Sequence, residues 1–363
     1  MRPDARVFVA PSGRTRSQVW KKAALSVSAL CLAIVTAEFV TRAVRPQDLT
    51  SPFRVFDHNG LSLNRANHVA LDQAGRDRIV SYRFNAHHLR GPAVDFSKRR
   101  IMFLGDSFTF GWLLDEKDTY VSLLQQKADS EFGAGTFQML NGAAIGWGTS
   151  AYLAFLENYG EALKPEMVAV FLSTDDIGRS MTDDFYVFDE QGALSFTPHP
   201  ERRNAAKEVL DSLPLYDALL DHSHLTRLVR ASYVTFQNSD PADQQRRTAS
   251  TVYAQPLGQA LFRRMRRWCA VHGCTLIVTT TGLQWLSDPG DPTSLFFEKA
   301  RDFFESEGIP FWDISDALHR TAGGDVAPFV IPDDGHFNER GSRLVAALTW
   351  PWIKDQMGLG RHR

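Results

Sequence analysis

A serine occupies a position where it could act as a nucleophile. Ser107 lies in Gly105-Asp106-Ser107, directly after the apolar run 100–104 (RIMFL), which predicts a buried strand. A serine at the carboxyl end of a parallel strand would lie at the sheet edge where open α/β folds bind ligands. Backbone N–H groups in the same turn could face the negative charge that develops when an ester is cleaved. The placement indicates acyl transfer, although Gly-Asp-Ser alone is more often a simple turn.

A histidine preceded by two carboxylates is the second candidate. His336 follows Asp333 and Asp334, just before the last predicted helix. A histidine that a carboxylate orients can take a proton from a serine as a general base. Taken alone, a His–Asp pair is more often a solvated feature of a loop.

Two further polar blocks end predicted strands. The first is 141–149 (NGAAIGWGT), in which Gly146 could bring its backbone N–H close to a substrate because no side chain blocks the approach. The second is Ser173-Thr174-Asp175-Asp176, which ends the third strand. Because these blocks follow different strands of one sheet, we expect them to meet at the same edge as the serine.

The elements that would position these blocks alternate along the chain. Strands are predicted over 100–104, 137–140, 167–172, 275–280 and 310–314. Helices are predicted over 117–129, 150–162, 257–271, 294–307 and 339–353. This alternation predicts a three-layer α/β/α fold with a central parallel sheet. The stretch 181–256 interrupts it, as either a cap over the site or a peripheral insertion.

The blocks together resemble the SGNH/GDSL hydrolase superfamily. The Gly-Asp-Ser at 105–107, the Asn-x-x-x-x-Gly at 141–146 and the Asp-x-x-His at 333–336 occur in that family's order and spacing. The segment 85–91 (NAHHLRG) resembles the one that precedes the serine block in membrane-anchored bacterial members. The resemblance covers about 53–180 and 257–355, and it implies a flavodoxin-like SGNH hydrolase domain over 99–355.

The resemblance implies a role for each matching residue. Ser107 would be the nucleophile and His336 the general base. Asp333, three residues before the histidine, is the preferred orienting carboxylate, and Asp334, two residues before it, is the alternative that some related families use. The backbone N–H groups of Ser107 and Gly146 would form part of an oxyanion hole.

The chain departs from the family at the remaining oxyanion donor, where Asp175 replaces an asparagine. An ionised Asp175 only accepts hydrogen bonds and would repel an oxyanion. Asp175 could be protonated in a dry pocket and still donate, or Thr174 or a residue of the insertion could supply the donor. Alternatively, the chain is a weakened or non-catalytic relative. We expect some activity because Ser107, Gly146 and His336 are all present.

The N-terminus predicts a membrane anchor. Residues 23–40 (AALSVSALCLAIVTAEFV) would form a helix of about 27 Å, enough for the core of a bilayer. Six cationic residues precede this run and fewer follow it, which places 1–22 in the cytoplasm and the rest of the chain across the membrane. The rival interpretation is a signal peptide cleaved before Glu38.

We expect a single-pass protein of the bacterial inner membrane. Its catalytic domain would lie in the periplasm or outside, after a linker and N-terminal extension over 41–98 that begins with a tether over 41–52. In an oxidising periplasm, Cys269 and Cys274 could form a disulfide, or they could be two unrelated small apolar residues.

Composition limits the partners. The chain has 363 residues with 40 Lys+Arg against 42 Asp+Glu, which argues against a nucleic-acid binder held by phosphate contacts. The absence of a phosphate loop or G-x-G-x-x-G predicts no nucleotide cofactor, and the histidine pairs 87–88 and 222/224 lack a third metal ligand. The basic run 263–267 (RRMRR) is typical of a solvated helix face, with an acidic glycan or a lipid headgroup as the alternative partner.

The sequence therefore predicts a serine esterase that acts on O-acyl esters, in particular O-acetyl esters. The compartment makes a cell-envelope or secreted glycan a candidate substrate. If a sugar hydroxyl replaced water, the same residues would make an O-acyltransferase that acts on polysaccharide. Two more functions stay open: a hydrolase of lipid esters, and a catalytically impaired SGNH-fold protein for glycan binding or assembly.

Overall fold

The computed structural model of the chain describes residues 16–74, 78–173, 175–203, 209–210, 213–237, 251–281, 294–332 and 334–359.

A central sheet of five parallel strands organises the fold. The strands are β5 (Arg99–Gly105), β6 (Phe137–Asn141), β7 (Met167–Leu172), β10 (Thr275–Thr280) and β11 (Phe311–Trp312). Their order is β11-β10-β7-β5-β6, and each neighbouring pair is parallel. The five predicted strands are all found, and β6 and β7 are buried along their whole length, as apolar runs in a doubly covered sheet should be.

The strand order creates a switch point at the centre of the sheet. From β5 the chain first moves outward to β6 and then returns to β7 on the other side of β5. This is the flavodoxin-like order, in which ligands bind at the carboxyl ends of the two strands where the direction reverses. The residues that follow β5 and β7 are therefore brought together at one edge.

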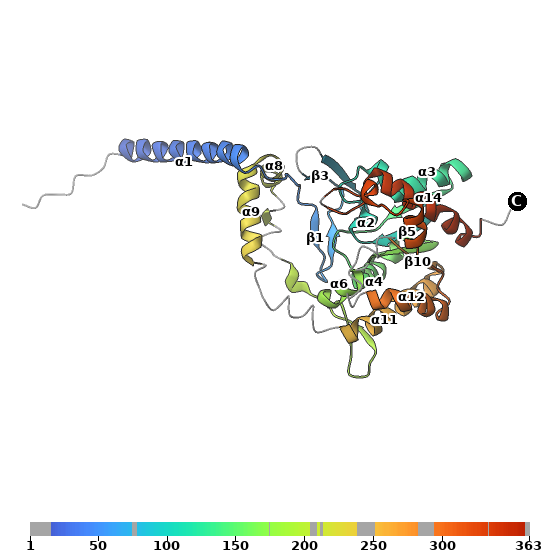
Figure 1. Cartoon of the computed structure of the whole chain (residues 1–363). Helices are drawn as coiled ribbons and strands as arrows, with labels where there is room; N and C mark the ends of the chain where they lie inside the picture. The colour runs from blue at the N-terminus through green and yellow to red at the C-terminus, as the bar shows by residue number, and fades with distance from the viewer. Residues whose placement is uncertain are drawn as a thin grey trace, which may run out of the picture.

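Helices cover both faces of the sheet (Figure 1). Alternate residues of β5 face opposite sides of the sheet. Ile101 and Phe103 pack into the hydrophobic core on one side, and Met102 and Leu104 pack into the core on the other side. The first layer contains α3 (Tyr120–Phe132), α13 (Ser315–Thr321) and α14 (Glu339–Gln356). The second contains α4 (Thr149–Phe155), continued by η2 (Leu156–Gly160) and α5 (Glu161–Leu163), with α11 (Thr251–His272) and α12 (Ser294–Ser306). The predicted three-layer α/β/α fold is confirmed.

The N-terminal extension forms short strands that the sequence did not predict. β1 (Arg54–Phe56) pairs with β2 (Ser62–Asn64), and β3 (His68–Ala74) pairs with β4 (Arg78–Phe84), both antiparallel. An aromatic cluster of Phe53, Tyr82, Phe84 and Phe110 joins these strands to the main domain. The extension therefore shares a core with the segment that follows Ser107.

The insertion over 181–256 packs at two separate places. A hairpin of β8 (Tyr186–Phe188) and β9 (Leu194–Phe196) lies against α11, where the Arg264 side chain donates to the Leu194 carbonyl. Further along the chain, α8 (Pro214–His222) and α9 (His224–Gln237) lie beside the first helix, α1 (Arg16–Val44) (Figure 1). The described parts of the insertion are thus peripheral to the sheet.

Within the described residues, one helix is long and apolar enough to cross a membrane, and it spans Trp20–Val44 of α1. Near its end, the Glu38 carboxylate accepts hydrogen bonds from the backbone N–H groups of His224 and Leu225 at 3.1 and 2.9 Å and from the Ser223 hydroxyl at 2.8 Å. Arg42 donates to the His222 carbonyl at 2.9 Å. These contacts cap the N-terminus of α9 with a charge from α1.

The segment predicted as a tether is held to the domain. The Gln47 backbone N–H donates to Nδ1 of His224, and the hydroxyls of Thr50 and Ser51 donate to the carboxylates of Asp72 and Asp221. A free linker over 41–52 is therefore not what the structure shows, because its polar groups find partners on the hairpin β3–β4 and on α8 and α9.

Cys269 and Cys274 are free thiols in the structure. The Cys274 backbone N–H donates to the Cys269 carbonyl at 2.9 Å and closes the turn that leads into β10. The two thiols are not bonded to each other, but they lie within hydrogen-bond distance, so they are not two unrelated residues.

A buried arginine fixes the extension to the turn that carries the serine. The Arg90 guanidinium is 4% exposed and donates to the carbonyl oxygens of Phe110, Gly111 and Leu114. It also stacks on Tyr82, with its central carbon 4.5 Å from the ring centre. Burial lowers the pKa of Arg90 to about 10, so the side chain remains a cation at neutral pH.

Replacing this arginine should destabilise the fold. We expect Arg90→Met to lower the free energy of unfolding by about 2–4 kcal/mol, because it removes the buried donor that three carbonyl groups share. Urea unfolding of the full chain in detergent micelles, followed by tryptophan fluorescence, measures this. The control is Arg83→Met, which removes only an exposed ion pair with Glu116 and should change stability by less than ~1 kcal/mol. Equal effects of the two changes would contradict the assigned role.

Candidate active site

Three side chains from two distant segments form a hydrogen-bonded line. The Ser107 hydroxyl lies 2.7 Å from Nε2 of His336, and Nδ1 of the same ring lies 2.6 Å from the Asp334 carboxylate. Nδ1 facing a carboxylate carries a proton, which leaves the Nε2 lone pair free to accept from the serine. This is the arrangement in which an imidazole activates a hydroxyl as a nucleophile.

The turn that presents Ser107 is built by its neighbours. The residue follows β5 and begins the short helix α2 (Ser107–Phe110), which Asp106 caps by accepting from the Phe108 N–H at 2.9 Å. The helix ends at Gly111 in the left-handed conformation, with φ of +82°. At Gly105, a Cβ would lie 1.9 Å from the Thr109 hydroxyl, so only glycine permits so tight a turn.

His336 is held between aromatic rings. Its ring stacks on Phe108 with 4.5 Å between the ring centres, and Trp112 lies 5.2 Å away on a tilted plane. The next turn is fixed by Asn338, whose side chain accepts from the backbone N–H groups of Arg340 and Gly341 and so caps α14. The imidazole side chain is 17% exposed, so most of the ring is shielded from solvent.

Gly146 occupies the turn after β6, with φ of +77°. The next residue, Trp147, is buried, and its indole N–H donates to the Ser62 carbonyl at 2.6 Å, which fastens the loop to β2. At Gly148, a Cβ would lie 2.5 Å from the Asp176 carbonyl, so this loop packs directly against the segment after β7.

An arginine that the sequence did not single out joins the two loops. Arg179, on α6 (Asp176–Asp183), donates to the Asp106 carboxylate at 2.9 Å and to the Trp147 carbonyl at 3.3 Å. Asp106 directly precedes Ser107, and Trp147 directly follows Gly146. Arg179 therefore positions the two segments that carry the expected oxyanion donors.

Two buried carboxylates surround this arginine. Asp106 and Asp176 are both fully buried, and the Ser173 hydroxyl lies between them at 2.8 and 3.1 Å. Burial, together with the neighbouring charge of Asp106, raises the pKa of Asp176 well above its usual range. Burial would lower the pKa of Arg179, but the two carboxylates outweigh it and raise that pKa, so the guanidinium is a permanent cation.

The structure places Asp175 away from any dry pocket. Its side chain is 62% exposed and forms an ion pair with Arg179 at 3.2 Å. The hypothesis that Asp175 donates from a dry pocket is therefore wrong, because this carboxylate is open to water and already accepts from a guanidinium. Thr174, the other candidate donor, lies outside the described residues, as does Asp333, the preferred orienting carboxylate.

Arg54 is a second cation beside the loop of Gly146. Its Nη2 atom lies 4.0 Å from where a Cβ on Gly146 would stand. Arg54 begins β1, so the N-terminal extension brings it to the site. Neither Arg54 nor Arg179 belongs to a periodic or motif-like pattern, so only the packing of β1 and α6 at the sheet edge reveals them.

Within the described ranges, no group of three or more His, Cys, Asp or Glu side chains is arranged to hold a metal ion. Two histidines from the pairs at 87–88 and 222/224 have other partners. His88 Nδ1 contacts the Asn64 carbonyl at 2.7 Å, and His224 accepts from Gln47.

The model of the GDSL-like lipase/acylhydrolase family matches residues 103–344, which include the serine turn and His336. The chain belongs to this family. It is an ester hydrolase of the SGNH/GDSL type, as the resemblance implied. The family assignment rests on this match over about two thirds of the chain.

Several solved structures are similar to the chain. TesA is 14% identical, with a TM-score of 0.43, and the alignment covers 71% of this chain and 99% of TesA. The esterase EstA from Pseudoalteromonas sp. is 12% identical, with a TM-score of 0.41 and coverage of 72% and 99%. The acetylxylan esterase Axe2 from Geobacillus stearothermophilus is 13% identical, with a TM-score of 0.42 and coverage of 73% and 97%. No curated protein sequence matches the chain.

Substitution of the two aspartates should identify the one that orients His336. We expect Asp334→Asn to lower kcat for ester hydrolysis by ~10²–10⁴-fold, because an amide no longer fixes the imidazole tautomer. Asp333→Asn, the matched neighbour, should lower kcat by less than about tenfold. Initial rates with p-nitrophenyl acetate measure both. A larger loss of kcat in the Asp333 variant would show that Asp333, three residues before His336, is the orienting carboxylate.

Proposed function

We propose that this family member is a membrane-anchored serine esterase that removes O-acetyl groups from glycans on the outer side of the cytoplasmic membrane. The observation that carries the proposal is the line from Ser107 through His336 to Asp334. A serine hydroxyl at 2.7 Å from a carboxylate-oriented imidazole is the geometry of nucleophilic acyl transfer.

The proposed reaction has two halves. The Ser107 oxygen attacks the ester carbonyl while Nε2 of His336 takes its proton, and the ester's alcohol leaves with that proton. A water molecule then attacks the acyl-enzyme, the imidazole again takes the proton, and acetate and the free serine are released. If a second sugar hydroxyl took the place of this water, the same steps would transfer the acetyl group.

The oxyanion in both halves would lie against the N–H groups of Ser107 and Gly146. We propose that Arg54 supplies the positive potential that the family's asparagine provides elsewhere. Arg179 acts through position, because it holds the two loops in register, and Arg54 acts through its charge next to Gly146. This arrangement supports activity in spite of Asp175.

The surroundings of the serine support a small acyl group. Ser107 is 4% exposed, and Phe108 and Trp112 crowd the imidazole beside it. A nucleophile with so little free surface accommodates the methyl group of an acetyl ester more readily than a long acyl chain.

Location outside the cytoplasm rests on α1. The helix is exposed along its apolar window, and the cationic residues before it favour a cytoplasmic N-terminus. The contacts of Glu38 and Arg42 with α8 and α9 support a retained helix, because they make the end of α1 part of the folded domain. An envelope or secreted glycan would then be the substrate within reach.

Ester turnover should depend on the serine and the histidine. We expect the full chain in detergent micelles to hydrolyse p-nitrophenyl acetate faster than the butyrate ester. Ser107→Ala and His336→Ala should each lower kcat by ~10³-fold or more. Acetate release from O-acetylated xylo-oligosaccharides, followed by an enzyme-coupled assay, tests the glycan part of the proposal. Turnover that survives Ser107→Ala would contradict the mechanism.

The rival function is a catalytically impaired glycan-binding protein, and Asp175 is the residue that favours it. Under our proposal, Asp175→Asn should raise kcat by ~10-fold or more and leave KM nearly unchanged, because a donor replaces a repelling carboxylate where charge develops. The control is Asp184→Asn. It removes a carboxylate from the C-terminal end of α6, whereas Asp175 lies at the N-terminal end, and it should leave kcat unchanged. A parent without turnover that gains activity through Asp175→Asn would favour the binding protein instead.

A further inference from the structure

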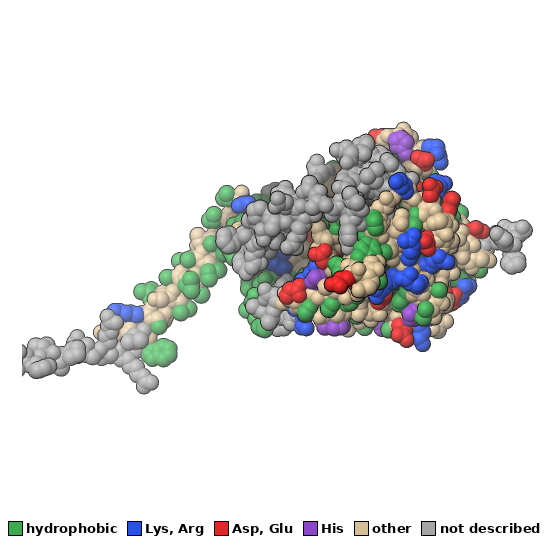
Figure 2. Space-filling model, turned by 90° about the horizontal axis from the view of Figure 1, so that it is seen from below, with side chains coloured by type: hydrophobic (Ala, Val, Ile, Leu, Met, Phe, Trp, Pro, Cys, Tyr) green, Lys and Arg blue, Asp and Glu red, His purple; other side chains and the backbone are tan. Residues whose placement is uncertain are grey.

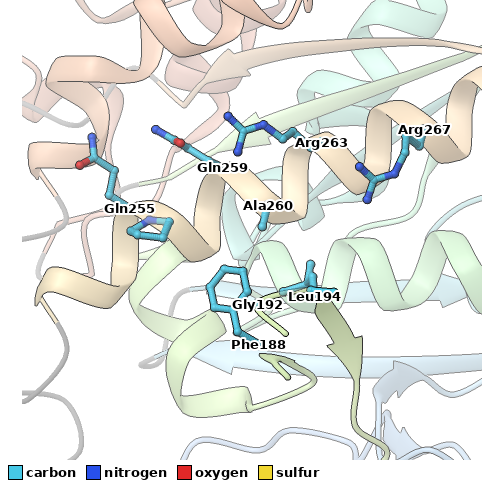
Figure 3. Close-up of a pocket in the computed structure, with 10 residues that line it drawn as sticks. Phe188, Gly192, Leu194, Gln255, Gln259, Ala260, Arg263 and Arg267 are labelled. Carbon is cyan, nitrogen blue, oxygen red and sulfur yellow. The ribbon is translucent and has the colours of Figure 1, made fainter. Parts of the chain in front are cut away.

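A groove lies between α11 and the hairpin β8–β9 (Figure 3). Its volume is about 520 Å³, and its lining includes Phe188, Leu194, Gln255, Gln259, Arg263 and Arg267. None of the lining residues belongs to the candidate active site. The hairpin is part of the insertion, so this groove is a feature that the insertion adds to the α/β fold.

One wall of the groove is a row of polar side chains. Gln255, Gln259, Arg263 and Arg267 recur at every fourth residue of α11, which keeps them on one side of the helix, and the row is about 18 Å long. Figure 3 shows these four side chains along the helix above Phe188 and Leu194. Among the described residues, Gln255, Gln259 and Arg267 have no hydrogen-bond or ion-pair partner, so their polar groups are available to a ligand.

The opposite side of the groove is apolar. Phe188 and Leu194 come from the two strands of the hairpin, and Gly192 and Ala193 add small residues that leave the space open. An aromatic ring and aliphatic carbons facing a row of amides and guanidinium groups suit a ligand with one polar edge and one face of C–H groups.

The charge near the groove is positive. Arg263 and Arg266 both contact the Glu307 carboxylate, at 2.7 and 3.1 Å, so two guanidinium groups share one anion, and Arg267 adds a third. Arg264, in contrast, has a structural role, since it binds Glu157 through two nitrogens. The basic run 263–267 therefore divides into one internal cation and an exposed positive face.

The tip of the hairpin carries two acidic residues outside the lining of the groove. Asp189 and Glu190 do not line the groove, and the Asp189 carboxylate accepts hydrogen bonds from the backbone N–H groups of Gln191 and Ala193 in its own turn. Figure 2, which views the molecule from below Figure 1, shows Lys and Arg side chains on one side of an apolar patch and Asp and Glu side chains on its other side.

We infer that this groove binds a stretch of a carboxylated polysaccharide. The carboxylate groups of the polymer would pair with Arg267 and Arg263, because guanidinium groups recognise carboxylates through two parallel hydrogen bonds. The amides of Gln255 and Gln259 can both donate to and accept from sugar hydroxyls. The C–H faces of the sugar rings would lie on Phe188 and Leu194. The row of four side chains is long enough to contact several consecutive sugars.

A lipid headgroup, the other anionic partner considered for the basic run 263–267, fits the groove less well. The site is concave, and α11 lies well away from α1 on the body of the domain (Figure 1). A bilayer that contains α1 would not reach it. The inference goes beyond the proposed esterase activity, because binding in this groove requires neither Ser107 nor His336.

The test measures binding in the absence of turnover. We use the full-length Ser107→Ala chain in detergent micelles and a size-defined oligogalacturonate as the probe, with a xylo-oligosaccharide of the same length as the neutral comparison. Isothermal titration calorimetry should show binding of the acidic oligomer and at least about tenfold weaker binding of the neutral one. Added salt should weaken the acidic interaction.

Two variants locate the site. Arg267→Gln should weaken oligogalacturonate binding by about tenfold, whereas Arg266→Gln, which removes the same charge from an exposed position of the same helix outside the groove, should weaken it less than about twofold. Gln259→Leu leaves the charge unchanged and should still weaken binding several-fold. The same substitutions in a chain that retains Ser107 should hydrolyse p-nitrophenyl acetate at the parental rate, which shows that the fold is intact.

Four results would overturn the inference. The first two are that oligogalacturonate does not bind, or that the neutral oligomer binds equally well. The third is that the Arg266 and Arg267 variants lose the same amount of affinity for oligogalacturonate. The fourth is that the chain binds anionic phosphatidylglycerol vesicles and that Arg267→Gln abolishes this binding but leaves oligogalacturonate binding intact. Failure of the proposed esterase activity would leave the binding result unaffected, so the two proposals fail separately.

Discussion

The carboxylate of Asp106 holds together the parts of the candidate site. It is completely buried, and it accepts from the Phe108 N–H, the Ser173 hydroxyl and the Arg179 guanidinium. Each donor belongs to a different segment: the serine turn itself, the end of β7 and α6. A buried carboxylate is tolerated only when it is paired and fully hydrogen-bonded. The sheet edge therefore has to bring these three segments together, and the position of Ser107 follows from that requirement.

The same requirement explains the arginines around the site. Asp176 is a second buried carboxylate near Asp106, and two such charges would repel each other without Arg179 between the loops. Arg90 has the corresponding role on the other side of the serine turn, where it satisfies three carbonyl groups at once. The region around the serine is thus fixed by polar contacts that leave little freedom for the turn to relax. Rigid support of this kind is what an oxyanion site needs.

The fold could largely be predicted from the sequence, because the strands of the sheet are apolar runs, four of which are buried over most or all of their length. Ser107, Gly146 and His336 were found because their blocks are local motifs at the ends of those strands. The choice between Asp333 and Asp334 could not be predicted, since it depends on the path of the loop: Asp334 also accepts from the His336 backbone N–H, and Gly335 has a φ of +87°. Arg54, Arg90 and Arg179 act through long-range packing, and an isolated arginine in a sequence gives no sign of which buried group it will meet. In the extension, β1 and β2 have three residues each and are too short to show a period, whereas the seven-residue strands β3 and β4 do alternate in burial and could have been found.

The hydrogen bonds between α1 and the N-terminus of α9 affect how the enzyme would reach its substrate. Because Glu38 caps α9 and the segment 47–51 is hydrogen-bonded to the domain, little free chain separates α1 from the body of the protein. With the helix in a bilayer as proposed, the catalytic serine would travel in two dimensions at a nearly constant height. Polymer segments at that height would be met at a high effective concentration, and those farther out would not be met at all. The height of the serine above the bilayer would then determine which layer of polymer the esterase can deacetylate.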